Sequence, residues 1–217
     1  MLKKSFLIFF AMYSIVLFAT SKNSLPNGYW LQKDKDANAN ISVIHAYNNQ
    51  NGNLNAEIFV PLANVDDDNK IYAPMIYCKN CGKGNAYGNK YDYSSGKEKY
   101  QGIEFVWNAK NSNTSTSDTK GPLYKDGAVL NPHDGKYYHM KAQTIENGQK
   151  VFVRAFWGMF GKDEYWERIT LKEAKKIRKL CGLTKNNVYS YEDKDGNVVN
   201  QKLFEECSTR DFMKKPL

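Results

Sequence analysis

The sequence predicts a mainly β protein, one eight-stranded antiparallel barrel followed by a short α-helical extension. Aromatic residues make up 14% of the 217 residues, with 15 Tyr, 11 Phe and 4 Trp. Such residues favour half-buried, pleated surfaces and therefore strands. Between residues 29 and 169, about eight short segments alternate apolar and polar residues or are rich in β-branched and aromatic ones. Because turn signals join them and no long helical pattern interrupts them, we expect a meander that removes its edges by closing.

The expected strands follow one another along the chain, with turn signals between most of them. Asn51-Gly52 and Asn147-Gly148 are hairpin signals, and residues 132–135 (PHDG) form another turn. Pro74 breaks residues 71–77, which form at best an edge strand, and residues 78–101 form a long loop. The strands expected in the barrel are residues 27–31, 41–47, 54–60, 103–107, 123–130 (a weak pair around Asp126-Gly127), 136–144, 149–156 and 165–169.

The pattern of apolar residues changes from alternation to helical spacing at Thr170, where a helix is expected to begin. Residues 170–173 (TLKE) fit a capping box, with Thr170 as N-cap and Glu173 at the third helical position. Apolar residues then recur at helical spacing as far as Cys181, and Gly182 can end the helix. Lysine and arginine cover the other faces. A basic amphipathic helix can lie on an anionic membrane, but such helices more often pack on their own domain, and we expect that here. Residues 170–217 are therefore assigned to a helix-containing C-terminal extension, and residues 22–169 to the barrel.

The first 21 residues are expected to be a signal peptide rather than part of the fold. Lys3 and Lys4 precede an apolar run over residues 5–18, and residues 19–21 (ATS) are small. This order is typical of a secretory signal, with cleavage near Ser21 or, alternatively, Ala19. A membrane anchor is the competing interpretation, but the run is short for a span of about 20 residues. We therefore expect an exported protein, periplasmic or secreted, with no transmembrane span after signal removal.

The four cysteines are expected to form two structural disulfides. Cys78 and Cys81 are followed by a Gly-rich stretch rather than by the helix of a redox motif, and no second pair completes a zinc site. An oxidising compartment favours disulfides. Four cysteines allow three pairings, of which we favour Cys78–Cys81 and Cys181–Cys207 because each lies within one local segment.

Composition and motifs favour neither a nucleic-acid-binding protein nor an enzyme. The net charge of +8 comes mostly from lysine, whereas readers of nucleic acid use arginine for bidentate contacts, and this chain has four. The chain contains no Gly-x-Ser-x-Gly elbow. Its histidines, His45, His133 and His139, show no ligand spacing with the cysteines, and the acidic run 66–68 fails the pattern of a calcium loop. We expect no catalytic residue, no metal and no cofactor.

Two tryptophan motifs resemble those of lipocalin-like barrels. Gly28 and Trp30 lie in the first expected strand, and Trp166 and Arg168 in the last. In lipocalin-like (calycin) barrels, a first-strand indole seals the closed end and stacks on a last-strand cation. We expect these four residues to be structural, with the guanidinium on the face of the indole.

Five further segments form a pattern over about residues 27–169. They are residues 131–138 (NPHDGKYY), 153–161 (VRAFWGMFG), 166–168 (WER), 28–30 (GYW) and 102–104 (GIE). Together they resemble one particular family, DUF2147. The chain departs from the family pattern at Asn131 and Ala155, and the extension after Thr170 lies outside the resemblance. The resemblance implies an exported bacterial protein with a lipocalin-like barrel and assigns no reaction to this protein.

The expected barrel suggests a binding function. An eight-stranded barrel is just wide enough for side chains or one small ligand. We expect one small apolar ligand, such as a lipid or fatty acid, in a monomer. The alternative is a filled barrel that serves as a structural or protein-interaction module of the cell envelope, with an envelope protein as partner. The residues predicted to line the interior are Phe105, Trp107, Tyr138, Met140, Val153 and Ala155.

Overall fold

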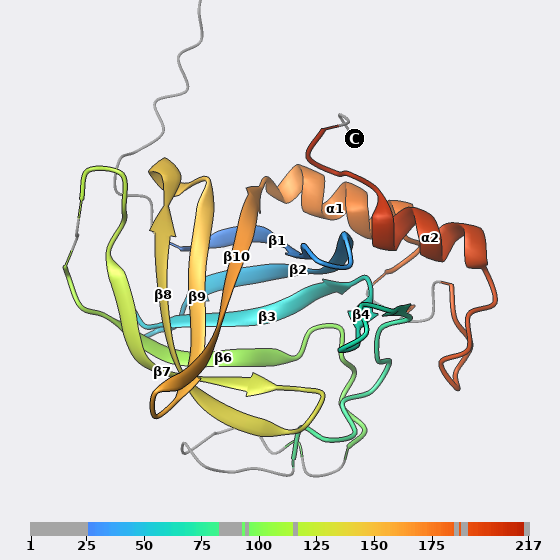
Figure 1. The fold of residues 1–217 in the computed structure, drawn as a ribbon, viewed down its shortest axis with the longest axis horizontal. Coiled ribbons are helices and arrows are strands. Elements are labelled where there is room, and N and C mark those ends of the chain that lie inside the picture. The colour runs from blue at the N-terminus through green and yellow to red at the C-terminus, as the bar shows by residue number, and fades with distance from the viewer. Residues whose placement is uncertain are drawn as a thin grey trace, which may run out of the picture.

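The computed structural model contains one closed antiparallel barrel of eight strands (Figure 1). It describes residues 26–82, 93, 96–114, 117–184, 187 and 191–214. The predicted signal peptide and most of the loop 83–95 therefore lie outside the described residues. Around the barrel, the strand order is β1-β10-β9-β8-β7-β6-β3-β2. The barrel strands are β1 (Gly28–Asp34), β2 (Ala39–Asn48), β3 (Leu54–Pro61), β6 (Glu104–Asn111), β7 (Leu123–Asn131), β8 (Lys136–Ile145), β9 (Lys150–Trp157) and β10 (Phe160–Ile169).

Short elements complete the chain. The crossover from β3 to β6 contains the two-stranded sheet of β4 (Asn64–Val65) and β5 (Ile71–Tyr72), so the edge strand expected over residues 71–77 is only two residues long. The 3-10 turn η1 (Glu146–Gly148) joins β8 to β9. Two helices, α1 (Leu171–Leu180) and α2 (Gln201–Thr209), follow the barrel.

The segment around Asp126-Gly127 is one strand, and its prediction as a weak pair was wrong. The register shifts between Tyr124 and Gly127, and Asp126 has a φ of 59°. This is a β-bulge rather than a turn. A Cβ on Gly127 would lie 2.6 Å from the Cβ of Ala109, so the close approach of β6 and β7 requires glycine there. A local Asp-Gly signal is shared by hairpin turns and bulges, and the neighbouring strand decides between them.

A second core lies outside the barrel, beneath the C-terminal extension. In Figure 1 the helices α1 and α2 lie across β1 and β2. They cover Leu31, Val43 and Val60, which point outward from β1, β2 and β3 and are fully buried. Helix α1 contributes Ala174 and Ile177. The expectation that α1 packs on its own domain agrees with this arrangement, and its predicted capping box between Thr170 and Glu173 is present.

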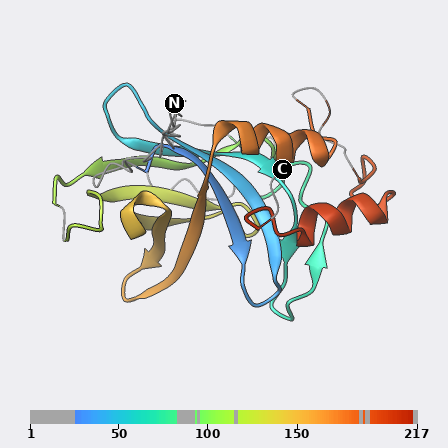
Figure 2. The same cartoon turned by 90° about the horizontal axis from the view of Figure 1, so that it is seen from above.

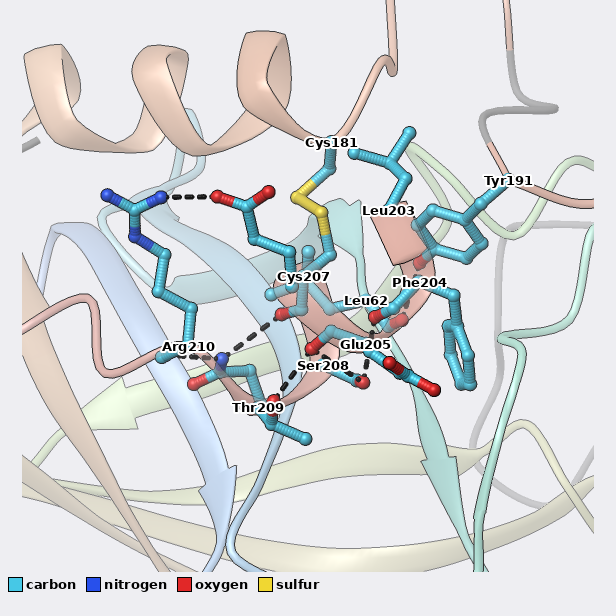
Figure 3. The surroundings of a disulfide bond; sticks show 12 residues. Leu62, Cys181, Tyr191, Leu203, Phe204, Glu205, Cys207, Ser208, Thr209 and Arg210 are labelled. Atoms are coloured by element: carbon cyan, nitrogen blue, oxygen red, sulfur yellow. Dashed lines mark hydrogen bonds and ion pairs between the residues drawn. A yellow bond between two sulfur atoms is a disulfide. The ribbon is translucent and has the colours of Figure 1, made fainter. Parts of the chain in front are cut away.

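Helix α2 was not foreseen from the sequence, and a disulfide ties it to α1 (Figure 3). Its N-cap is Asn200, whose side chain accepts a hydrogen bond from the backbone of Leu203. The Cys181–Cys207 disulfide joins the end of α1 to α2. The buried Asn40 of β2 donates to the carbonyls of Cys207 at 3.1 Å and Arg210 at 2.8 Å. The disulfide and these bonds hold α2 against the barrel wall.

The other disulfide, Cys78–Cys81, closes a turn in the β3–β6 crossover. This turn covers the outer face of β8, because the hydroxyl of Tyr137 donates to the carbonyl of Cys81 at 3.1 Å. Asn80 in the same turn donates to the carbonyl of His133 at 2.6 Å. Both disulfides thus fasten segments that lie on the outside of the barrel.

Candidate binding site

One end of the barrel is sealed by Trp30 and Arg168. The carbon at the centre of the Arg168 guanidinium lies 4.2 Å from the ring centre of Trp30. Arg168 also donates to the carbonyls of Gly148 at 2.5 Å and Asn27 at 3.1 Å, and the indole of Trp30 donates to the carbonyl of Pro26 at 2.7 Å. Gly28 has a φ of 125°, and a Cβ there would lie 3.1 Å from the guanidinium. Three of the four residues predicted to be structural, Gly28, Trp30 and Arg168, meet here. The fourth, Trp166, lies two residues before Arg168 on β10 and points into the barrel.

The hollow inside the barrel next to the Trp30 seal is almost filled. The space left between the side chains around it is about 10 Å³. A single water molecule needs roughly 10–15 Å³ measured this way, so nothing larger fits. The residues around this space are Pro26, Trp30, Ala46, Leu54, Ala56, Val106, Met140, Ala142, Val151, Val153 and Trp166. Of the six residues predicted to line a ligand cavity, Met140 and Val153 border this space.

The other predicted lining residues occupy different places. Phe105 is buried inside the barrel, 6.3 Å from the ring of Trp166. Tyr138 and Ala155 are half-buried and pack against the edge of the interior core. The hydroxyl of Tyr138 donates to a carboxylate oxygen of Asp134 at 3.2 Å.

The prediction that Trp107 lines the interior is corrected by the structure. Register shifts between β3 and β6 place Ala56 opposite Val106 but Glu57 opposite Glu104, so β6 has one extra residue here. Val106 therefore points inward, and strand alternation turns Trp107 outward. There its ring stacks on Tyr137 at 5.6 Å, beneath the Cys78–Cys81 turn. The bulge was invisible in the sequence because both residues before Trp107 are apolar.

A polar network links side chains of β1, β2 and β10. Glu164 accepts hydrogen bonds from Gln32 at 2.8 Å and Trp166 at 3.0 Å, and Ser42 donates to Gln32 at 2.8 Å. Tyr100, from the β3–β6 crossover, is buried beside them, and burial and Glu164 raise the pKa of its hydroxyl.

A larger hollow lies outside the barrel, between α1 and the outer faces of β1 and β3. We call it the α1 groove. Its volume is about 390 Å³, in the range of small-molecule sites. Sequence analysis missed it, since its residues come from three separated elements and only the basic pattern of α1 hinted at it. The groove is lined by Tyr29, Phe59, Leu171, Lys175, Arg178, Lys179, Gly182, Leu183 and Thr184.

Aromatic rings form the floor of the α1 groove. Tyr29 stacks on His45 with ring centres 4.6 Å apart, and it meets Phe59 edge-on at 5.1 Å. His45 in turn lies 3.0 Å from a carboxylate oxygen of Glu57. Burial raises the pKa of the Tyr29 hydroxyl, and Glu57 adds to this effect. The floor is therefore apolar and rigid, with its one phenol held neutral.

The helix side of the α1 groove is cationic. The Arg178 guanidinium lies over the ring of Phe59 at 4.8 Å, and its buried Nε has no hydrogen-bond acceptor among the described residues. Burial lowers the pKa of Arg178, while Glu57 and Tyr29 raise it. In the described part of the chain, no carboxylate lies within 4.0 Å of Lys175, Arg178 or Lys179. Apolar floor and unpaired cations together suit an amphipathic anion.

A closed eight-stranded antiparallel barrel, sealed at one end by a tryptophan–arginine contact, defines a lipocalin-like protein. The chain belongs to the family DUF2147, described as an uncharacterized protein conserved in bacteria, whose family model matches residues 28–168. Both the predicted fold class and the predicted family are thereby confirmed.

The chain was also compared with solved structures and with curated proteins. Among solved structures, the chain is similar to HP1028 of Helicobacter pylori, described as belonging to the lipocalin family, with a TM-score of 0.47 and 19% identity. That match covers 76% of this chain and 94% of the other. No curated protein matches. Within the described residues, none of the helices has the length and apolar character needed to cross a membrane.

Proposed function

We propose that this chain is an exported, non-enzymatic binding protein that holds a small amphipathic anion in the α1 groove, on the outside of a filled barrel. The observation that carries the proposal is the contrast between the two hollows, about 390 Å³ in the groove and about 10 Å³ inside the barrel. The close-packed interior supports a scaffold role for the barrel. The ligand expected inside the barrel from the sequence is thus proposed for the α1 groove instead, with an apolar body and a negative head.

The groove offers an apolar surface for the body of such a ligand and positive charge for its head. The rings of Tyr29 and Phe59 offer an apolar surface already in place, so little ordering is required on binding. Arg178 offers a half-buried guanidinium, which binds carboxylate and phosphate through two parallel hydrogen bonds. Lys175 and Lys179 add positive charge at the rim.

The absence of catalysis is part of the proposal. His45 and Glu57 form the nearest acid–base pair to the groove, at 3.0 Å. In the part of the chain that the structure describes, the side-chain partners of His45 are Glu57 and the rings of Tyr29 and Tyr47. A nucleophilic catalyst needs a serine, threonine or cysteine within hydrogen-bond reach of its base. We therefore assign the pair to the support of Tyr29.

Binding of dodecanoate, measured by calorimetry below its micelle concentration, tests the site. We expect one molecule to bind per chain, and dodecyltrimethylammonium, with the same tail and the opposite charge, to bind at least tenfold more weakly. Arg178→Gln should weaken dodecanoate binding by about tenfold or more. Lys172→Gln is the matched control, because it removes the same charge from α1 outside the groove. Equal binding of the two amphiphiles, or equal losses for the two variants, would contradict the proposal.

Export is tested separately. The two disulfides support an oxidising compartment. Sequencing the N-terminus of the mature native protein should give a start near Lys22. A mature chain that begins at Met1 would remove export from the proposal and leave groove binding unaffected.

A further inference from the structure

The turn between β9 and β10 exposes three large apolar side chains that the fold does not use. Trp157, Met159 and Phe160 are 70%, 86% and 75% exposed. Single exposed apolar residues are ordinary, but a contiguous group marks a surface that meets something apolar. Figure 2 shows the turn (gold to orange, lower left) at the edge of the molecule, away from α1 and α2. We call Trp157, Met159 and Phe160 the apolar tip.

The apolar tip is held rigidly. Strands β9 and β10 stay paired to the very end, with Phe160 opposite Trp157 and Gly161 opposite Phe156. A Cβ on Gly161 would lie 2.8 Å from the carbonyl oxygen of Ala155, so only glycine allows this close pairing. Behind the tip, Arg154 and Asp163 form an ion pair of 2.7 Å across the two strands. The backbone of the hairpin end therefore cannot bend onto the barrel without breaking this ladder.

Positive charge lies behind the apolar tip. Lys162 is exposed two residues beyond Phe160. It has no carboxylate within 4.0 Å among the described residues, whereas Arg154 and Asp163 neutralise each other. The end of the hairpin thus presents apolar side chains first and a cation behind them.

We propose that the apolar tip inserts into the interfacial layer of an anionic phospholipid bilayer. Trp and Phe side chains settle at the level of lipid headgroups, and lysines just behind them meet anionic phosphates. A convex tip of three side chains is far smaller than the roughly 800 Å² that each partner buries in a stable protein–protein interface. In a bilayer, by contrast, the tip is surrounded on all sides. This inference is independent of the α1 groove.

Tryptophan fluorescence offers a direct test, because Trp157 is the exposed one of the four tryptophans and Trp30, Trp107 and Trp166 are buried. The full chain is titrated with unilamellar vesicles of phosphatidylcholine and phosphatidylglycerol. We expect the emission to shift to the blue, and we expect this shift to disappear in Trp157→Phe, which still binds. Cosedimentation of the chain with the vesicles gives the affinity.

Three variants separate insertion of the apolar tip from non-specific hydrophobic adsorption. Met159→Ser combined with Phe160→Ser should weaken cosedimentation by tenfold or more, while Val199→Ser, which removes an equally exposed apolar side chain outside the tip, should leave it unchanged. Lys162→Gln should weaken binding at low salt and matter less at high salt. Failure of the wild-type chain to bind, binding that ignores the tip substitutions, or a tip that instead drives the chain to dimerise would each overturn the proposal.

Discussion

Trp30 and Arg168 are the two residues on which closure of the barrel depends. Trp30 is 0% exposed, and Arg168 joins it to the carbonyls of two separate segments, at Asn27 and Gly148. The pair therefore fastens β1, β10 and the turn before β9 at one point. The stabilisation from the Trp30–Arg168 contact should appear as a coupling free energy between the two side chains.

A double-mutant cycle measures this coupling. We expect Trp30→Ala to cost about 3–5 kcal/mol of the free energy of unfolding, because it removes a buried indole. Arg168→Ala should cost about 1–3 kcal/mol through its lost hydrogen bonds and ring contact. The double variant should cost less than the sum. Urea unfolding gives all three values, and Trp157→Ala, at an exposed site, serves as the control. Strictly additive losses would mean that the contact is absent in solution.

We expect Glu192 to make the stability of the extension depend on pH. Its side chain is 5% exposed, and burial raises its pKa from 4.5 to about 7, with a smaller contribution from Asp193. The folded state thus holds the proton more tightly than the unfolded state does. Below pH 4.5 both states carry it, so no penalty applies, and the penalty grows as the pH rises toward about 7.

The corresponding variant is Glu192→Gln, which keeps the shape and removes the titration. We expect the difference in unfolding free energy between this variant and the wild type to grow in favour of the variant between pH 4.5 and 7 and to level off above it. Thermal melts across this range measure the difference. Asp195→Asn, on the exposed turn nearby, should show no such trend. A difference that does not vary with pH would show that the carboxyl is solvated.

At the scale of elements, the two disulfides should contribute unequally. In the chain-entropy description, the stabilisation grows with the length of the closed loop. Cys181–Cys207 spans 26 residues and Cys78–Cys81 only 3. Both sites are buried, so the local packing of the sulfur atoms is comparable.

Paired serine variants test this difference. Replacing both Cys181 and Cys207 should cost about 3–4 kcal/mol, and replacing both Cys78 and Cys81 about 1.5 kcal/mol. Chemical unfolding of the two double variants beside the wild type gives the values. A larger loss for the Cys78–Cys81 variant would mean that the turn over Tyr137 stabilises the barrel through its contacts rather than through loop closure.

At the scale of the whole molecule, the extension is part of the folded unit rather than an appendage. Leu31, Val43 and Val60 point out of the barrel and are buried in the cluster that they form with residues of α1, α2 and the segments next to them. A barrel without the helices would expose a contiguous apolar face on three neighbouring strands, which promotes aggregation.

Truncation after Ile169 tests this dependence. We expect the shortened chain to aggregate, or to bind a hydrophobic dye strongly, while the full chain does neither. A chain that ends after Leu183 keeps α1 but loses α2 and should behave in between. A monomeric truncated barrel with an unchanged melting temperature would instead make residues 170–217 an independent unit.

Much of this architecture follows from the sequence. Alternation of apolar and polar residues, with turn signals between strands, predicted the closed antiparallel barrel, since both features depend on near neighbours in the chain. The Gly28–Trp30 and Trp166–Arg168 motifs predicted the seal, and the capping box predicted the start of α1. Local spacing also favoured the two disulfide pairings that the structure contains.

Tertiary structure alone decided the candidate site. The sequence could name apolar side chains but not the volume between them, and the hollow inside the barrel next to Trp30 measures only about 10 Å³. The bulge that turns Trp107 outward depends on the register of β3 against β6, which no local pattern reports. The α1 groove exists because Tyr29, Phe59 and Arg178 meet from three separated elements. Strand periodicity is a property of consecutive residues, whereas packing density and register are properties of distant ones, and for this reason the sequence determined the barrel and the fold decided where its hollows lie.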